Sequence, residues 1–167
     1  MFRRMDDFLN AYDSLREGTG KMMDIMTDEM LVRRVAEGHR TLGGMAWHIT
    51  TTIPEMMKQV GLGLSSVDAE APPPGSAKEI ADAYRKVSAE LAAALREKWS
   101  DDTLEIEDDL YGQKFARGKT LAAVLSHETH HRGQMTVLLR QAGAVVPGLF
   151  GPAKEEWEGY GKEPPPY

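Results

Sequence analysis

Apolar residues recur at helical spacing along four long segments of the chain, which predicts four amphipathic helices. The segments cover residues 6–26, 41–61, 76–99 and 120–141. Strand-like alternation is almost absent, and one short helix is expected near the C-terminus over residues 153–159. Four helices of about 20 residues joined by loops are typical of a four-helix bundle. We therefore expect an all-α four-helix bundle with a short C-terminal helix, in which residues 1–167 form a single domain.

Individual residues mark where these helices begin, weaken and end. The Gly18–Gly20 stretch weakens the first helix, because glycine costs about 1 kcal/mol relative to alanine, and a kink or a junction of two shorter helices is expected there. Pro54 predicts a bend or a break in the second helix. Ser76–Glu79 fits a capping box, Thr120 is a candidate N-cap, and Gly143 is a plausible terminator.

Two stretches outside the helices carry weaker signals. Residues 101–118 are rich in acids, and the alternation in Thr103–Ile106 predicts a short extended segment but too little for a sheet. Residues 161–167 are expected to form a disordered tail. Its end, Pro164–Tyr167, matches a ligand motif of small proline-recognising domains, but so short a match arises readily by chance.

Composition narrows the possible functions. The formal net charge is −6 and no basic patch is present, which argues against nucleic-acid binding. The absence of cysteine excludes disulfides, zinc–thiolate sites and cysteine nucleophiles. No stretch approaches the roughly 20 apolar residues of a membrane helix, and the N-terminal residues lack the apolar run of a signal peptide. We expect a soluble cytoplasmic protein with no membrane or nucleic-acid partner.

Three of the five histidines, His127, His130 and His131, lie close together in the last predicted helix. Successive helical residues turn by about 100° around the axis. His131 falls almost on the centre of the apolar stripe, His127 lies about 40° from it, and His130 is displaced by roughly 100° from His131. The stripe consists of Leu121, Val124, Met135 and Leu138. His127 and His131 are therefore expected to point into the bundle as an i,i+4 pair, with His130 nearer to solvent.

A pair of inward imidazoles one turn apart indicates a metal site. Four ring nitrogens would otherwise need hydrogen-bond partners in an apolar layer, and a divalent ion removes that difficulty. A third ligand must come from another element. His48 lies at the margin of the inward face of the second predicted helix, whereas His39 precedes that helix and is expected at the surface. A lone buried histidine is more often a hydrogen-bonded core residue. His48 is therefore a candidate ligand only in combination with the pair His127 and His131.

The run from His127 to His131 also matches the H-E-x-x-H pattern of zinc proteases. Chance matches to so short a pattern are common, and neither the downstream third histidine of metzincins nor a strand-rich half is present. We therefore set the protease interpretation aside. Glu128 is kept as a candidate partner of a ligand or as a general base.

Four stretches together closely resemble the DinB/YfiT family of metal-dependent enzymes. The most specific is the H-x-x-x-H-R-G-Q run within Leu125–Gln134. The others are Ala46–Ile49, the lead-in Arg117–Leu121 to the last helix, and Val146–Pro152. The resemblance extends over nearly the whole chain.

The resemblance implies a four-helix bundle, usually dimeric, with three histidine ligands. Residue by residue, the first ligand falls on His48 and the last-helix pair on His127 and His131, in agreement with the helical geometry. Characterised relatives include thiol-dependent S-transferases and a mycothiol-dependent isomerase. A homodimer is therefore expected, with a low-molecular-weight thiol as a possible co-substrate.

Three neutral nitrogen ligands leave a coordination position for water or substrate, and they suit zinc or nickel among other ions. The leading hypothesis is a transferase in which the metal activates a thiol that attacks a small electrophilic substrate. The alternatives are a hydrolase using metal-bound hydroxide and a metal-binding protein without turnover. Glu128 and Arg132 are the candidate catalytic residues. For Arg132 the choice lies between binding an anionic group and forming a salt bridge with Glu128 four residues earlier.

Overall fold

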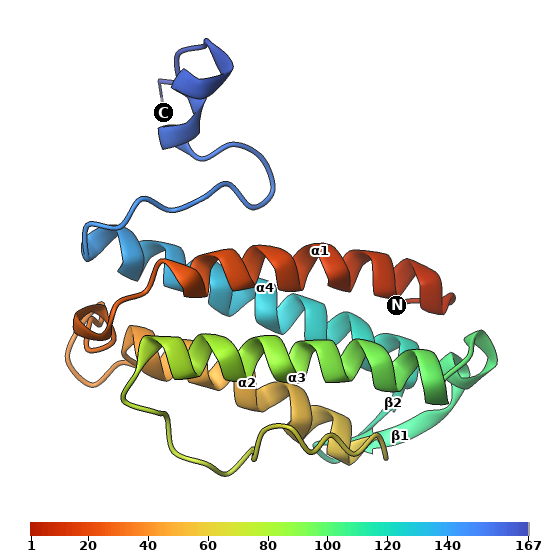
Figure 1. Ribbon diagram of the computed structural model, residues 1–167. Helices are drawn as coiled ribbons and strands as arrows, with labels where there is room; N and C mark the ends of the chain where they lie inside the picture. The colour runs from red at the N-terminus through yellow and green to blue at the C-terminus, as the bar shows by residue number, and fades with distance from the viewer. Residues whose placement is uncertain (167) are drawn as a thin grey trace.

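Four long helices dominate the computed structural model, which describes residues 1–166 (Figure 1). They are α1 (Met5–Asp24), α2 (Leu42–Gln59), α3 (Ala77–Lys98) and α4 (Arg117–Gln141). Helices α1 and α2 each pack against both α3 and α4, so one apolar core fills the centre of the bundle. The expected all-α four-helix fold is confirmed.

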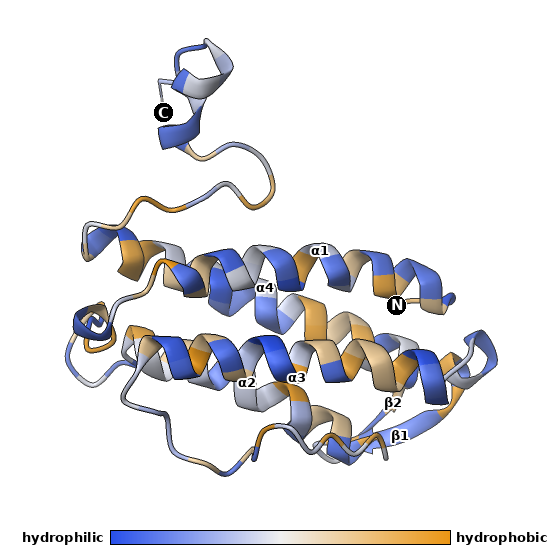
Figure 2. Ribbon diagram, viewed as in Figure 1, coloured by the Kyte–Doolittle hydropathy of each residue, from blue (hydrophilic) through white to orange (hydrophobic). Residues whose placement is uncertain are grey.

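Each helix carries apolar residues on its inner side and polar residues on its outer side, as the alternating colours in Figure 2 show. Among the residues described, no helix combines the length and the apolar character that crossing a membrane requires.

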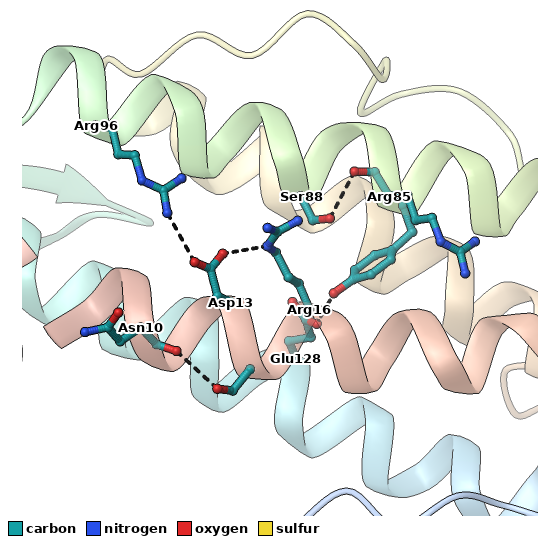
Figure 3. A network of polar contacts seen from close by, with 9 residues as sticks. Asn10, Asp13, Arg16, Arg85, Ser88, Arg96 and Glu128 are labelled. Atoms are coloured by element: carbon teal, nitrogen blue, oxygen red, sulfur yellow. Dashed lines mark hydrogen bonds and ion pairs between the residues drawn. The ribbon is translucent and has the colours of Figure 1, made fainter. Parts of the chain in front are cut away.

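At the outer edge of the α1–α3 interface, Asp13 accepts hydrogen bonds from Arg16 (2.8 Å) and Arg96 (3.1 Å) (Figure 3). Deeper in the bundle, the rings of Phe8 and Tyr12 on α1 stack at a centroid distance of 5.4 Å.

Helix α1 runs unbroken through the Gly18–Gly20 stretch, contrary to the expected kink or junction. The reason lies in packing rather than in helix propensity. A Cβ atom on Gly18 would lie 2.9 Å from Nη1 of Arg132 and 3.2 Å from a methyl carbon of Leu149. Glycine at this position therefore lets α4 and the following segment approach α1 closely.

Helix α2 is likewise continuous from Leu42 to Gln59, so Pro54 lies inside it without a break. The helix begins where predicted, because the Thr41 side chain accepts a hydrogen bond from the Gly44 backbone N–H (3.0 Å). Residues 25–41 connect α1 to α2 and include the 3₁₀ helix η1 (Asp28–Met30). This connection folds back over the start of α2, where the Leu42 N–H donates to the Arg33 carbonyl (2.7 Å).

The segment between α3 and α4 is more structured than predicted. The stretch Thr103–Ile106, predicted to be extended, lies largely within a 3₁₀ helix, η2 (Asp101–Glu105). The following residues form a two-stranded antiparallel sheet of β1 (Glu107–Leu110) and β2 (Gln113–Ala116). Tyr111 and Gly112 both have positive φ (54° and 78°), which suits the two-residue turns that join right-twisted strands.

Helix α4 starts three residues earlier than predicted, directly after β2, with Ala116 rather than Thr120 at the N-cap. The start is fixed by Arg117, whose guanidinium pairs with Asp108 (2.7 Å) and stacks on Trp99 at 4.7 Å. Ser76 caps α3 by accepting from the Glu79 backbone N–H (3.4 Å), which is one of the two hydrogen bonds of the predicted capping box.

The segment directly after α4 still packs on the bundle, with Val146 in the core and Leu149 against it, and the chain that follows leaves the bundle (Figure 1). The short C-terminal helix is a 3₁₀ helix, η3 (Lys154–Tyr160), and residues 163–166 have no regular secondary structure. The prediction of a disordered tail over 161–167 stays a prediction, and its last residue, Tyr167, lies outside the described residues.

Candidate metal centre

Three imidazoles meet between α2 and α4, the two helices that supply them. His48 comes from α2, and His127 and His131 come from successive turns of α4. The three ring centroids are 4.5, 4.7 and 5.0 Å apart, and one nitrogen from each ring lies within 4.8 Å of the other two. The structure thus brings together the three histidines that the sequence singled out.

Hydrogen bonds at the outer nitrogens orient two of the rings. Nδ1 of His131 lies 2.7 Å from Oε1 of Gln134, and Nδ1 of His48 lies 3.4 Å from the Thr52 hydroxyl. An amide oxygen only accepts, so Nδ1 of His131 carries the hydrogen and Nε2 keeps its lone pair. Such outer partners fix the tautomer of metal-binding histidines. Gln134 therefore prepares His131 to bind a cation through Nε2, and the Thr52 hydroxyl lies beside Nδ1 of the His48 ring.

The donor set fits a divalent ion. Nε2 of His48 and Nε2 of His127 lie 3.2 Å apart. In a tetrahedral site with metal–nitrogen bonds of about 2.0–2.1 Å, two ligand nitrogens are about 3.3–3.4 Å apart. If both nitrogens carry lone pairs, they repel each other at this distance unless a cation lies between them. Zinc and nickel both accept imidazole nitrogen, so the three histidines are suitable ligands for either.

The surroundings keep the three rings in the neutral form that binds metals. Burial is the largest cause, and it lowers the pKa of His48 and of His127 from 6.5 to about 4. Burial also lowers the pKa of His131. The positive charge of Arg40 acts in the same direction on all three. All three imidazoles are therefore neutral at pH 7.

The other two histidines lie outside this cluster. His130 is exposed, and its Nε2 lies 3.2 Å from the amide nitrogen of Gln134. His39 is exposed in the connection before α2. The structure therefore separates His127 and His131 from His130 in the way that the helical geometry predicted.

Glu128 follows His127 on α4, but its carboxylate reaches α1 and α3 rather than α2 (Figure 3). Its Oε1 accepts hydrogen bonds from the Thr19 hydroxyl (2.7 Å) and the Tyr84 hydroxyl (2.5 Å). Only 2% of Glu128 is exposed, and its Oε2 has no partner among the described residues. Burial raises the Glu128 pKa, while the two hydrogen bonds and the charge of Arg132 oppose that rise.

A cavity of about 10 Å³, lined in part by Thr52, His127 and Glu128, is the place where this carboxyl borders the histidine cluster. It has room for about one water molecule. Glu128 thus makes its direct hydrogen bonds to α1 and α3 within the core, and it also lines the small cavity that Thr52 and His127 border.

Arg132 is buried between α1, α4 and the segment that follows α4, with 2% of the residue exposed. Its Nη1 donates to the Leu15 carbonyl (3.1 Å), and its guanidinium lies 5.0 Å from the centre of the Phe150 ring. None of the ion pairs formed within residues 1–166 joins Arg132 to Glu128. Arg132 therefore ties α4 to α1 and to the C-terminal segment.

A pocket of about 390 Å³ opens beside the cluster and reaches His131. Its walls come from the connection before α2, from the start of α2 and from the second half of α4. They consist of Val35, His39, Arg40, Met45, His131, Gln134, Val137 and Leu138. Sequence reasoning missed the part played by the connection, because irregular segments carry no periodic signal. The i,i+3 spacing of His131 and Gln134 was a signal that could have revealed their contact.

The fold and the site together define a class of protein, the four-helix bundles with three histidines gathered between two helices. Within that class, the chain belongs to the DinB family, whose sequence model matches residues 1–165. The resemblance drawn from the sequence motifs is thereby confirmed.

Relatives of known sequence or structure agree with this placement. The chain is 39% identical over 165 residues, 99% of each chain, to uncharacterized protein YrdA of Bacillus subtilis strain 168. A crystal structure of a DinB-like protein from Bacillus cereus ATCC 10987 superposes with a TM-score of 0.86 at 42% identity, covering 90% of this chain and all of the other. The DinB-like protein YjoA of Bacillus subtilis shares the fold at 19% identity, with a TM-score of 0.69 and coverage of 86% and 96%.

Proposed function

We propose that the protein is a metal-dependent enzyme, a thiol-dependent S-transferase that acts on small electrophiles. His48, His127 and His131 would hold one divalent ion, with zinc and nickel as the preferred candidates. The observation that carries the proposal is the convergence of these three neutral imidazoles next to an open pocket. Membership of the DinB family supports metal binding at these positions.

The number of ligands favours an enzyme over a structural metal site. Within residues 1–166, the cluster of potential ligands contains three histidines and no carboxylate. Structural zinc sites almost always have four protein ligands, whereas catalytic sites have three and leave a position open. The pocket that reaches His131 supplies a route by which a small molecule approaches that position.

When bound, the ion supplies Lewis acidity, which lowers the pKa of a coordinating thiol or water. Gln134 and Thr52 hold two of the rings in place, and Val137 and Leu138 supply apolar surface in the adjoining pocket. In the transfer, the thiol proton passes to solvent, and the sulfur forms a bond to the electrophilic carbon. The leaving group departs with the electron pair of its former bond.

The position of Glu128 favours a thiol over water as the nucleophile. A hydrolase of this type needs a general base beside the reacting water, within hydrogen-bond reach of it. Glu128 is the acid nearest to the cluster in sequence. Its Oε1 is occupied by Thr19 and Tyr84, its Oε2 is buried, and the residue lines the cavity of about 10 Å³ rather than the pocket that reaches His131. A thiol needs no such base, because coordination itself favours the thiolate.

The test is a thiol-consumption assay on protein loaded with zinc or with nickel. L-cysteine, glutathione and coenzyme A would each be mixed with monochlorobimane, and the fluorescent thioether would be followed. We expect turnover above the uncatalysed rate with wild type and none above it with His131→Ala. Hydrolysis of p-nitrophenyl esters without any thiol would instead support a hydrolase. Inactivity in both assays, despite bound metal, would support a metal-binding protein without turnover.

A further inference from the structure

The pocket beside His131 differs in charge from the rest of the chain. The sequence contains 26 acidic and 20 basic residues, yet no acidic residue lines this pocket. Its charged or chargeable lining residues are Arg40, His39 and His131. A metal ion on the three-histidine cluster would add further positive charge at its inner end. The pocket therefore attracts anions, although the protein as a whole is negative.

The Arg40 guanidinium is available to bind an anionic ligand. None of the ion pairs found in the described part of the chain involves it, and its side chain is exposed at the pocket wall. It lies just before Thr41, whose cap fixes the start of α2, so the backbone that carries Arg40 is anchored at that point. A guanidinium in such a place recognises carboxylates and phosphates through paired hydrogen bonds.

The same pocket also has an apolar lining. It consists of Val137 and Leu138 of α4, Val35 of the connection and Met45 of α2. Val35 and Val137 remain 64% and 50% exposed, which leaves apolar surface available to a ligand. The volume of about 390 Å³ lies within the range of small-molecule sites.

We propose that this pocket binds a small molecule with an anionic group, carboxylate or phosphate, and a short apolar body. Arg40 holds the anionic group and the valine and leucine side chains hold the apolar body. The assignment rests on the proposed function in that it makes this molecule the substrate, or the thiol, whose reacting group lies near His131. Arg40 is a binding residue in this scheme.

Hexanoate, hexyl phosphate and 1-hexanol serve as probes with the same apolar chain. Each would be titrated into ¹⁵N-labelled protein, with and without zinc, and dissociation constants would be read from the amides of residues 35–40 and 134–138. The test variant is Arg40→Met, which removes the charge but keeps an unbranched side chain. The matched control is Arg34→Met, an exposed arginine of the same connection that does not line the pocket.

We expect at least one anion to bind more tightly than 1-hexanol. Arg40→Met should lower the affinity for that anion by about three- to tenfold, the effect expected for the loss of a charge-assisted hydrogen bond at a partly exposed site. Binding of 1-hexanol should be unchanged, and Arg34→Met should behave as wild type. Equal binding of anions and alcohol, or equal effects of the two variants, would overturn the assignment.

Zinc content measured on the same samples separates the two proposals. If zinc does not bind but the anion preference depends on Arg40, the proposed enzyme fails while the pocket assignment stands. If zinc binds at one ion per chain and the anion preference is absent, the pocket assignment alone fails.

Discussion

Two tyrosine hydroxyls of this protein each donate a hydrogen bond to a carboxylate, one in the core and one at the surface. Comparing the loss of each hydroxyl tests the packing of the core around α4. The Tyr84 hydroxyl donates to Glu128 at 2.5 Å with no exposure of the tyrosine. The Tyr111 hydroxyl donates to Glu55 at 2.7 Å, and 61% of Tyr111 is exposed. Replacing either tyrosine with phenylalanine removes one hydroxyl and little else. The two variants therefore differ mainly in what the carboxylate loses.

The loss should be large only in the core. Removing Tyr84 Oη leaves Oε1 of Glu128 with Thr19 as its donor, while Oε2 already has no partner among the described residues. A hydrogen bond to a charged group contributes about 1.5–3 kcal/mol, and bulk solvent does not reach the carboxylate at this depth. We expect Tyr84→Phe to lower the free energy of unfolding by about 2–3 kcal/mol. Tyr111→Phe should change it by less than about 0.5 kcal/mol, since water solvates Glu55.

Urea denaturation at pH 7, followed by far-ultraviolet circular dichroism, measures both values under the same conditions. For a chain of this length, the loss in Tyr84→Phe corresponds to a fall in Tm of roughly 4–12 °C. Equal stability of the two variants would show that Glu128 is not held in the core as described. A large loss in Tyr111→Phe alone would show that the β-hairpin contact matters more than the core contact.

Two further predictions concern packing and pH. Gly20→Ala should stabilise the protein by up to about 1 kcal/mol, because its Cβ would meet no atom nearer than 3.9 Å. Gly18→Ala should leave the stability unchanged or lower it, since its Cβ would press on Arg132. Thermal melts of the two variants test this, and equal gains in stability would contradict the packing argument. Only the neutral imidazole binds metal, and the pKa of His48 and of His127 is lowered to about 4, so proton competition is moved to lower pH. Zinc affinity can be measured against a chelating dye of known pH dependence. It should change less than about threefold from pH 7.5 to pH 6 and fall steeply only below about pH 5. A steep decline in affinity that starts at pH 6.5 would contradict this expectation.

The three-histidine cluster was predictable from the sequence because helical geometry alone separates the faces of α4. Residues 127 and 131 are one turn apart, whereas residue 130 is displaced by roughly 100° from residue 131 around the helix axis. This follows from the sequence without any tertiary information. The partner His48 required the pairing of α2 with α4, which periodicity does not specify. There, the resemblance to a family supplied what the pattern could not.

The misjudged features share a different cause, namely contacts between segments far apart in sequence. The glycine at position 18 weakens an isolated helix, but in the fold it makes room for Arg132, more than 100 residues later. The hydrogen bonds that Thr19 and Tyr84 donate to Glu128 likewise come from distant helices, although Glu128 does line a small cavity together with His127. The hairpin after α3 depends on a turn at Tyr111 whose positive φ no residue preference predicts.

The pocket wall formed by the connection before α2 belongs to the same group. Arg40 looked like one more scattered basic residue in the sequence. Only the folding of residues 25–41 over the start of α2 brings it to the pocket that reaches His131. Irregular segments of this kind follow from the packing of their neighbours, so their chemistry becomes visible only in the structure.

The most direct test of the metal centre compares the metal content of three proteins purified without an affinity-metal step and then equilibrated with zinc. Elemental analysis should find about one ion per chain in wild type and in His130→Ala, and almost none in His131→Ala, because only the second ring belongs to the cluster. Equal metal content in His130→Ala and His131→Ala, whether both full or both empty, would contradict a site built from His48, His127 and His131.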